Sequence, residues 1–227
     1  MIQALGVATP KEATLFVIAT FMPPLGAPQG MKLLASTDGV RAWPGGFGFA
    51  KVGANYGPSL MANSEARARG YDQVLWLLNG QVTEAGASNF FVMWKSKEGK
   101  TQLVTAPLGD KIILDGVTRR SILQLTRERL SHWRSGLDPV EIVERHFTME
   151  DVVEAVAEGR ILEAFAAGTA ASFDLCSLGR YANHFKQYFV CPVCVIHYKG
   201  QNLHIPMSQG HSGPYAALIK SWLVDIM

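Results

Sequence analysis

Residues 41–56 read RAWPGGFGFAKVGANY, and this stretch constrains the fold more than any other part of the 227-residue chain. Four glycines and one proline in sixteen residues exclude an ordinary helix or strand interior. Glycines also let the backbone come close to another group, and we expect that group to be a ligand. The stretch, called the glycine-rich loop below, therefore predicts part of a binding site.

Apolar runs on either side of this loop predict strands. Residues 13–21 (ATLFVIATF) form a continuous run that suits a strand buried on both faces. Residues 74–78 (VLWLL) form a second such run. Two further runs, 89–94 and 102–106, flank the polar KSKEGK and predict a β-hairpin. Another strand is expected over 160–165.

Helices are predicted from their end signals, over 58–69 before Gly70, from about 117, from 148 to Gly159, and over the C-terminal segment. Thr148 and Asp151 have the spacing of a capping box. Because hairpin-like strands are frequent among these elements, the pattern favours an α+β fold over a strict βαβ repeat.

Composition excludes several classes of function. The chain is 48% hydrophobic, enough for a packed core, and its net charge is +2 with dispersed basic residues. A nucleic-acid or membrane partner would need a clustered basic face, so neither is expected. The three cysteines make no disulfide framework, which favours a reducing compartment.

Lys51 is the candidate nucleophile of the glycine-rich loop. Its neighbours are small and apolar, and an amine in such surroundings loses solvation of its charged form, which lowers its pKa. The alternative is a solvated loop lysine, and composition alone favours that alternative.

Three further stretches carry candidate polar groups. Glu84 in TEAGASN could pair with a ring nitrogen or could be an exposed turn acid. Gly116-Val117-Thr118 opens a helix, where free N–H groups favour an anion or serve as a plain N-cap. The turn at Thr169 could present a hydroxyl to a second anion. Together with Lys51, these parts match the needs of a pyridoxal phosphate site.

At this point the sequence resembles a known family, the branched-chain amino acid aminotransferases of fold type IV, and most closely their fungal members. The resemblance runs from about Ala4 to Ile226. Its strongest stretches are VRAWPGGFGFAKVGANYGPSL, QVLWLLNGQVTEAGASNFFV, ILDGVTRRSIL and ILEAFAAGTAA.

The resemblance implies a role for each matching residue. Lys51 would be the Schiff-base lysine and proton shuttle, Tyr56 would bind the phenolic oxygen of the cofactor, and Glu84 would bind its pyridine nitrogen. The phosphate would be bound by Val117 and Thr118 N–H groups and by the Thr169 hydroxyl. The Ala170 N–H would help to bind the substrate carboxylate. No metal ligand is implied.

The same resemblance implies the wider biology. It implies pyridoxal 5′-phosphate as cofactor, and transfer of an amino group between leucine, isoleucine or valine and 2-oxoglutarate. It also implies a homodimer in the cytoplasm or the mitochondrion.

The resemblance also divides the chain. Residues 1–22 correspond to the last strand of a small N-terminal domain that is otherwise mostly missing, 23–31 to the interdomain loop, and 32–227 to the large pyridoxal phosphate-binding domain. Residues 172–189 interrupt the pattern, and we interpret them as an insertion.

Two alternatives to a working aminotransferase stay open. The missing domain and the insertion are compatible with a catalytically impaired, truncated remnant that binds the cofactor or only dimerises. A different substrate, as in D-amino acid aminotransferase or aminodeoxychorismate lyase relatives, is a weaker possibility, because the RAWPGG stretch disfavours it. Cys191 and Cys194 could be a redox or zinc pair, but buried structural cysteines are favoured.

Overall fold

The computed structural model describes residues 12–18, 30–132, 136–169, 189–208 and 212–226 of the chain. Nine strands of this part form one sheet, ordered β3-β2-β1-β8-β7-β4-β5-β6, with β9 paired to β8. Because β3 also pairs with β4, the path β3-β2-β1-β8-β7-β4 closes into a ring, from which β5 and β6 extend. The strands are β1 Met31–Ala35, β2 Gln73–Leu78, β3 Gln81–Ala85, β4 Ser88–Lys95, β5 Thr101–Thr105, β6 Val140–Glu144, β7 Ile161–Gly168, β8 Phe189–Tyr198 and β9 Gln201–His204.

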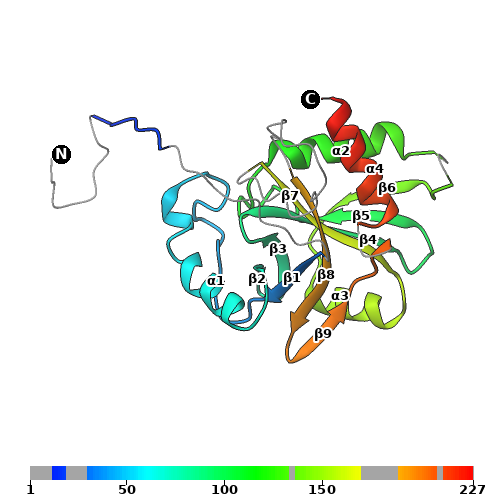
Figure 1. The fold of residues 1–227 in the computed structure, drawn as a ribbon, viewed down its shortest axis with the longest axis horizontal. Helices are drawn as coiled ribbons and strands as arrows, with labels where there is room; N and C mark the ends of the chain where they lie inside the picture. The colour runs from blue at the N-terminus through cyan, green and yellow to red at the C-terminus, as the bar shows by residue number, and fades with distance from the viewer. Residues whose placement is uncertain (1–11, 19–29, 133–135, 170–188, 209–211, 227) are drawn as a thin grey trace, which may run out of the picture.

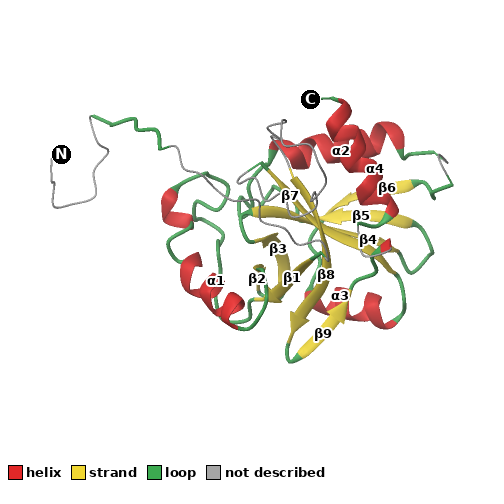
Figure 2. Cartoon of the chain, in the orientation of Figure 1, coloured by secondary structure: helices red, strands yellow, loops and turns green. Residues whose placement is uncertain are grey.

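The described helices lie on the outside of this sheet (Figure 1, Figure 2). Helices α2 and α4 pack against each other, α3 lies against β7 and β9, and α1 lies against β2. The helices are α1 Ser59–Ala68, α2 Val117–Arg129, α3 Met149–Ala157 and α4 Pro214–Asp225, and a short 3-10 helix, η1, spans Gly53–Asn55. Parallel and antiparallel strand pairs occur in the same sheet, so the α+β prediction is confirmed.

The local signals of the sequence are confirmed where they are strongest. Strands β4 and β5 pair antiparallel as the predicted hairpin. Thr148 caps α3 by accepting from the Asp151 N–H, and the Asp151 carboxylate accepts from the Thr148 N–H in return. Gly70 follows α1 with a positive φ of 82°, which is the C′ conformation that glycine favours.

The core lies on both sides of β4, because successive side chains of a strand point to opposite faces. Phe90 and Trp94 belong to the apolar cluster that α3 covers, whereas Phe91 belongs to the cluster under α2 and α4. Trp76 packs in a third cluster beside α1. All four of these aromatic residues are buried and therefore form core rather than a stacking surface.

One sequence-based expectation is wrong over its described part. Residues 12–18 form no strand, and Leu15 is 92% exposed, because no described segment pairs with this part of the apolar run at 13–21. Met31, the last residue of the predicted interdomain loop, starts β1. Phe189, the last residue of the predicted insertion, is the first residue of β8 and pairs with Gly168. The rest of that segment, up to residue 188, lies outside the described residues, and the division into domains stays a prediction.

Candidate cofactor site

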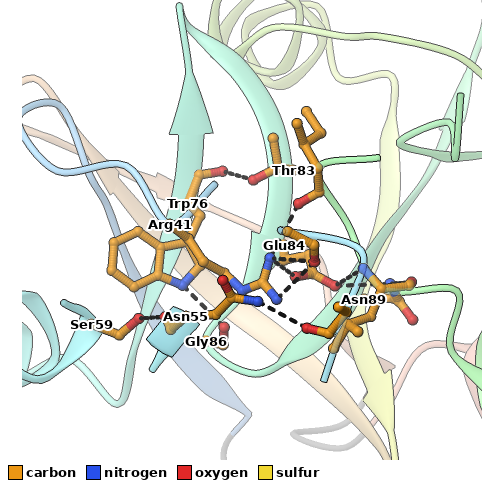
Figure 3. A network of polar contacts seen from close by, with 12 residues as sticks. Arg41, Asn55, Ser59, Trp76, Thr83, Glu84, Gly86 and Asn89 are labelled. Carbon is orange, nitrogen blue, oxygen red and sulfur yellow. Dashed lines mark hydrogen bonds and ion pairs between the residues drawn. The ribbon is translucent and has the colours of Figure 1, made fainter. Parts of the chain in front are cut away.

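The glycine-rich loop is held in place by side-chain bonds to its own backbone. Asn55 Nδ2 donates to the carbonyl oxygens of Phe47 and Ala50, each at 2.8 Å. Ser59 Oγ, at the start of α1, donates to the Asn55 carbonyl oxygen at 3.1 Å (Figure 3). These bonds fix the segment that carries Lys51.

Arg41 anchors the start of this loop to the rest of the fold. Its buried guanidinium donates to the Gly48 carbonyl oxygen at 3.3 Å and to the Ile112 carbonyl oxygen at 3.1 Å. A Cβ at Gly48 would lie 2.7 Å from the Ile112 carbonyl oxygen, so only glycine fits there. The expected close approach therefore occurs at Gly48, but to another chain segment.

Lys51 and Tyr56 form a pair on the surface of the loop. Lys51 Nζ donates to the Tyr56 hydroxyl oxygen at 2.6 Å and lies 4.6 Å from the centre of the Tyr56 ring. Lys51 is exposed, as in the solvated-lysine alternative that composition favours, and it does not lie in apolar surroundings. Its amine is open to a molecule that approaches from solvent.

Glu84 is the buried acid of the site and lies on β3, where it is 1% exposed. Its Oε1 accepts hydrogen bonds from Asn89 Nδ2 and from the Leu114 N–H, both at 3.1 Å. Its Oε2 lies 2.8 Å from Arg41 Nη1 (Figure 3). The alternative of an exposed turn acid is therefore wrong.

Burial raises the pKa of Glu84 to about 7, because a carboxylate loses solvation inside the protein. The positive charges of Arg41, Lys51 and Arg119 and the Leu114 N–H oppose this rise. The positive charge of Lys51 is thus one of the charges that lower the pKa of Glu84. A further cation or hydrogen-bond donor beside a carboxyl group with this pKa would change its protonation near neutral pH.

Two buried oxygens in this region have no hydrogen-bond donor among the described residues. Arg41 forms an ion pair with Glu84 Oε2, but the approach lacks hydrogen-bond geometry, so Oε2 accepts no hydrogen bond. Thr118 Oγ1 is also buried without a partner. Unsatisfied buried polar atoms are rare in folded proteins because they are costly, and these two are candidates for contact with a bound molecule.

The N-terminus of α2 provides donors for an anion. Its N-cap, Gly116, makes no side-chain capping bond, and the first N–H groups of a helix have no intrahelical partner. The Val117 and Thr118 N–H groups are therefore available, and the helix dipole favours negative charge beside them. The nearby acid Asp115 pairs with Arg120, whose Nε lies 2.7 Å from Asp115 Oδ1, so its charge is compensated.

Thr169 directly follows the last residue of β7. It lies at the end of the sheet where β4 begins, because Ala167 of β7 pairs with Asn89 of β4. Its side chain is exposed. Ala170 lies outside the described residues, so its expected contact with a substrate carboxylate stays a prediction.

The residues present fit a phosphate-bearing pyridine ring. Glu84 Oε2 lacks the donor that a protonated ring nitrogen would provide, and Thr118 Oγ1 lies buried beside free helix N–H groups that suit a phosphate. Lys51 supplies an accessible amine for an aldehyde. A series of contacts connects the predicted residues. Lys51 donates to Tyr56, Arg41 joins the glycine-rich loop to Glu84, and Glu84 accepts from the N–H of Leu114, three residues before Val117.

Sequence reasoning missed two residues of this site. It quoted Arg41 and Asn89 inside their motifs but assigned no role to either. A charged or amide side chain in a stretch of small and apolar residues is a signal of a buried polar contact. The sequence does not show that Arg41 contacts Glu84, because the two residues are far apart along the chain.

The cysteine pair gives no sign of a second site. Cys191 is buried in the core, and Cys194 Sγ lies 3.5 Å from the Met31 carbonyl oxygen. Burial raises the pKa of the Cys194 thiol, which disfavours a reactive thiolate. Among the described residues, no group of three His, Cys, Asp or Glu side chains could hold a metal ion. No described helix has the length and apolar character needed to cross a membrane.

Comparison with known proteins points to one family. The family "Amino-transferase class IV" matches residues 2–159. The mitochondrial branched-chain-amino-acid aminotransferase of Schizosaccharomyces pombe is 41% identical over 99% of this chain and 48% of its own length. The cytosolic enzyme of that name from Saccharomyces cerevisiae is 42% identical over 98% of this chain and 54% of its own.

A solved structure agrees with these sequence matches. The branched-chain amino acid aminotransferase from Escherichia coli superposes with a TM-score of 0.60 at 26% identity, over 87% of this chain and 52% of that one. This chain spans about half the length of the relatives that it matches.

Proposed function

Because this chain belongs to the class IV aminotransferase family, we propose that it binds pyridoxal 5′-phosphate and transfers amino groups between branched-chain amino acids and 2-oxoglutarate. The observation that carries the proposal is the buried Glu84 carboxylate, whose Oε2 is ion-paired with Arg41 at 2.8 Å but accepts no hydrogen bond from the described residues. A protonated ring nitrogen would supply a donor. The choice of leucine, isoleucine and valine rests on the names of the relatives.

Lys51 and Tyr56 would act on the reacting side of the ring. When bound, pyridoxal phosphate supplies an electron sink for the α-carbon of an amino acid. Lys51 Nζ would hold the aldehyde carbon with release of water and would be freed when the amino group of the substrate takes its place. The free amine would then move the proton from the α-carbon of the substrate to the former aldehyde carbon. The Tyr56 hydroxyl, 2.6 Å from that nitrogen, would orient the amine and donate to the phenolic oxygen of the ring.

Glu84 would keep the ring nitrogen protonated. Burial alone favours the neutral carboxyl, but a cationic N–H beside Oε2 lowers the pKa of Glu84 and favours the carboxylate. Arg41 acts in the same direction, because its guanidinium lies 2.8 Å from Oε2. The acid would therefore be ionised when its ligand is present.

The phosphate would lie at the N-terminus of α2. The Val117 and Thr118 N–H groups would donate to it, and the Thr169 hydroxyl would add a contact from the end of β7. The Ala170 N–H would bind the carboxylate of the amino acid.

The proposal extends to assembly and location. We expect a homodimer, and light scattering of the purified chain tests this. We expect the chain in the cytoplasm or the mitochondrion, where the names of its relatives place those proteins.

A second candidate function is that of a cofactor-binding or dimerising module without turnover. The exposed lysine favours it, because Lys51 lies in a loop whose large side chains Trp43 and Phe47 are 55% and 67% exposed. Water that reaches Lys51 would hydrolyse reactive species or support side reactions there, and turnover of this kind requires a site that excludes water.

Borohydride reduction of the purified chain with added pyridoxal phosphate, followed by peptide mass mapping, tests the proposal. We expect a phosphopyridoxyl mass on Lys51 and its loss in Lys51→Ala. Lys111→Ala is a matched control, because Lys111 is exposed near the same loop, with Nζ 5.7 Å from the Phe49 ring. Label spread equally over both lysines would contradict a built site. Label on Lys51 without transamination of leucine would favour the second function.

A further inference from the structure

Asn89 occupies the place where the acid and the phosphate donors meet. It lies near the start of β4, directly opposite Glu84 of β3 in the antiparallel register. Directly opposite residues of such a pair present their side chains on the same face of the sheet. Asn89 is 4% exposed, so its amide must find partners inside the protein.

The amide of Asn89 bridges two chain segments. Its Nδ2 donates to Glu84 Oε1 at 3.1 Å and to the Leu114 carbonyl oxygen at 2.9 Å (Figure 3). Both partners are acceptors, so the chemistry of the contact requires the NH₂ group to face them. One side chain therefore holds Glu84 and the residues that lead into α2.

The other end of the amide fits against Gly116. A Cβ at Gly116 would overlap Asn89 Oδ1, so the backbone of this segment passes as close to Asn89 as glycine allows. The Leu114 N–H donates to the same Glu84 Oε1 at 3.1 Å. Glu84, Asn89 and the segment 114–116 thus form a closed set of contacts, and the next residues are the Val117 and Thr118 donors.

We propose that Asn89 is a positioning residue that fixes the distance between the carboxylate of Glu84 and the phosphate donors of α2. This inference rests on the proposed function, because it concerns a ligand that contacts both Glu84 and the N–H groups at the start of α2. A pyridine ring with a phosphate on a short arm is nearly rigid, so its two ends bind together only if the protein holds their partners at the matching separation. Preorganisation of this kind increases affinity by reducing the ordering that binding requires.

Asn89→Ala breaks the contact that joins Glu84 to the segment before α2, and it removes none of the groups that we propose to contact the ligand. We compare the concentrations of pyridoxal phosphate and of pyridoxal, which has no phosphate, that half-label Lys51 on reduction. In Asn89→Ala we expect pyridoxal phosphate to bind about tenfold to a hundredfold more weakly, and pyridoxal no more than about threefold, since only the first ligand uses both ends.

Asn89→Asp keeps the shape and volume of the side chain but loses the donor, and it covers the case in which Asn89→Ala does not fold. Thr83→Val is the matched control. Thr83 is a buried neighbour of Glu84 whose hydroxyl donates to the Trp76 carbonyl oxygen at 2.9 Å. Because successive residues of β3 alternate between faces, Thr83 points away from the Glu84 carboxylate, and we expect equal small changes for both ligands.

A second readout needs no ligand. Amide hydrogen exchange in the cofactor-free chain should become faster at Leu114 and Gly116, whose N–H groups are hydrogen-bonded, in both Asn89 variants, and stay unchanged over β2. Equal weakening of both ligands, or unchanged exchange at Leu114 and Gly116, would overturn the positioning role. Failure of the unaltered chain to bind pyridoxal phosphate at Lys51 would overturn the proposed function, and the positioning role with it.

Discussion

Glu84→Gln should remove a large part of the pH dependence of folding. The pKa of Glu84 rises in the folded chain from its ordinary value of 4.5 to about 7, chiefly because the carboxyl is buried. One pKa unit is worth about 1.4 kcal/mol, so this rise corresponds to about 3 kcal/mol between the two protonation states. Glutamine keeps the shape of the side chain and carries no titrating proton.

The sign follows from proton binding. As the pH rises above about 4.5, the unfolded chain loses this proton while the folded chain keeps it until about 7. Stability from the neutral form is therefore fully present at low pH and is lost as the pH rises through the folded value. We expect the unfolding free energy of the unaltered chain to fall by up to about 3 kcal/mol more than that of Glu84→Gln over this range.

Urea unfolding followed by tryptophan fluorescence, at about pH 5 and about pH 8, measures this difference. Glu141→Gln is the matched control, because Glu141 is an exposed carboxylate on β6 and Gln102 Nε2 donates to it at 2.9 Å. We expect the control to follow the unaltered chain. Equal loss of stability in the unaltered chain and in Glu84→Gln would refute the assignment of Glu84 as a buried acid that ionises only at a cost.

Two further changes test other contacts. Tyr56→Phe removes the acceptor of Lys51 Nζ and should weaken pyridoxal phosphate binding by about tenfold, as read from the labelling titration; unchanged binding would exclude the role of the hydroxyl. Gly213→Ala should destabilise the chain by about 1–3 kcal/mol in urea, because a Cβ there overlaps the buried Glu163 carboxylate, whereas Gly109→Ala meets no atom within 4 Å and should be neutral.

The parts of the fold that depend on neighbouring residues could be predicted from the sequence. The capping box of α3, the glycine after α1 and the β4–β5 hairpin are each specified within a few positions. The strand predicted over 13–21 is wrong over its described part, because strand formation depends on a distant partner and not only on neighbouring residues. Its composition suits a buried strand, but a strand needs a partner, and residues 12–18 have none among the described residues.

The candidate site shows the same division. Lys51 and Glu84 could be named from short stretches of unusual composition, whereas Tyr56 was named from the family resemblance. The contacts that set their properties could not. Arg41 reaches Glu84 from the glycine-rich loop, and Leu114 reaches it from the segment before α2, both far from Glu84 in the sequence. Asn89 is only five residues away, but its contact with Glu84 depends on the pairing of β3 with β4. Sequence patterns gave the chemical groups, and only the sheet register shows which ones share a carboxylate.

The exposure of these groups separates the proposed cofactor binding from the proposed turnover. Glu84, Asn89 and Thr118 are buried in the described fold, so the acid and one hydroxyl of the proposed phosphate site lie in its interior. Lys51 is exposed. Under the proposed function, binding would depend mainly on the buried groups, whereas proton transfer at Lys51 Nζ would depend on exclusion of water. Labelling of Lys51 and transamination are therefore two independent tests, and the chain can pass the first while failing the second.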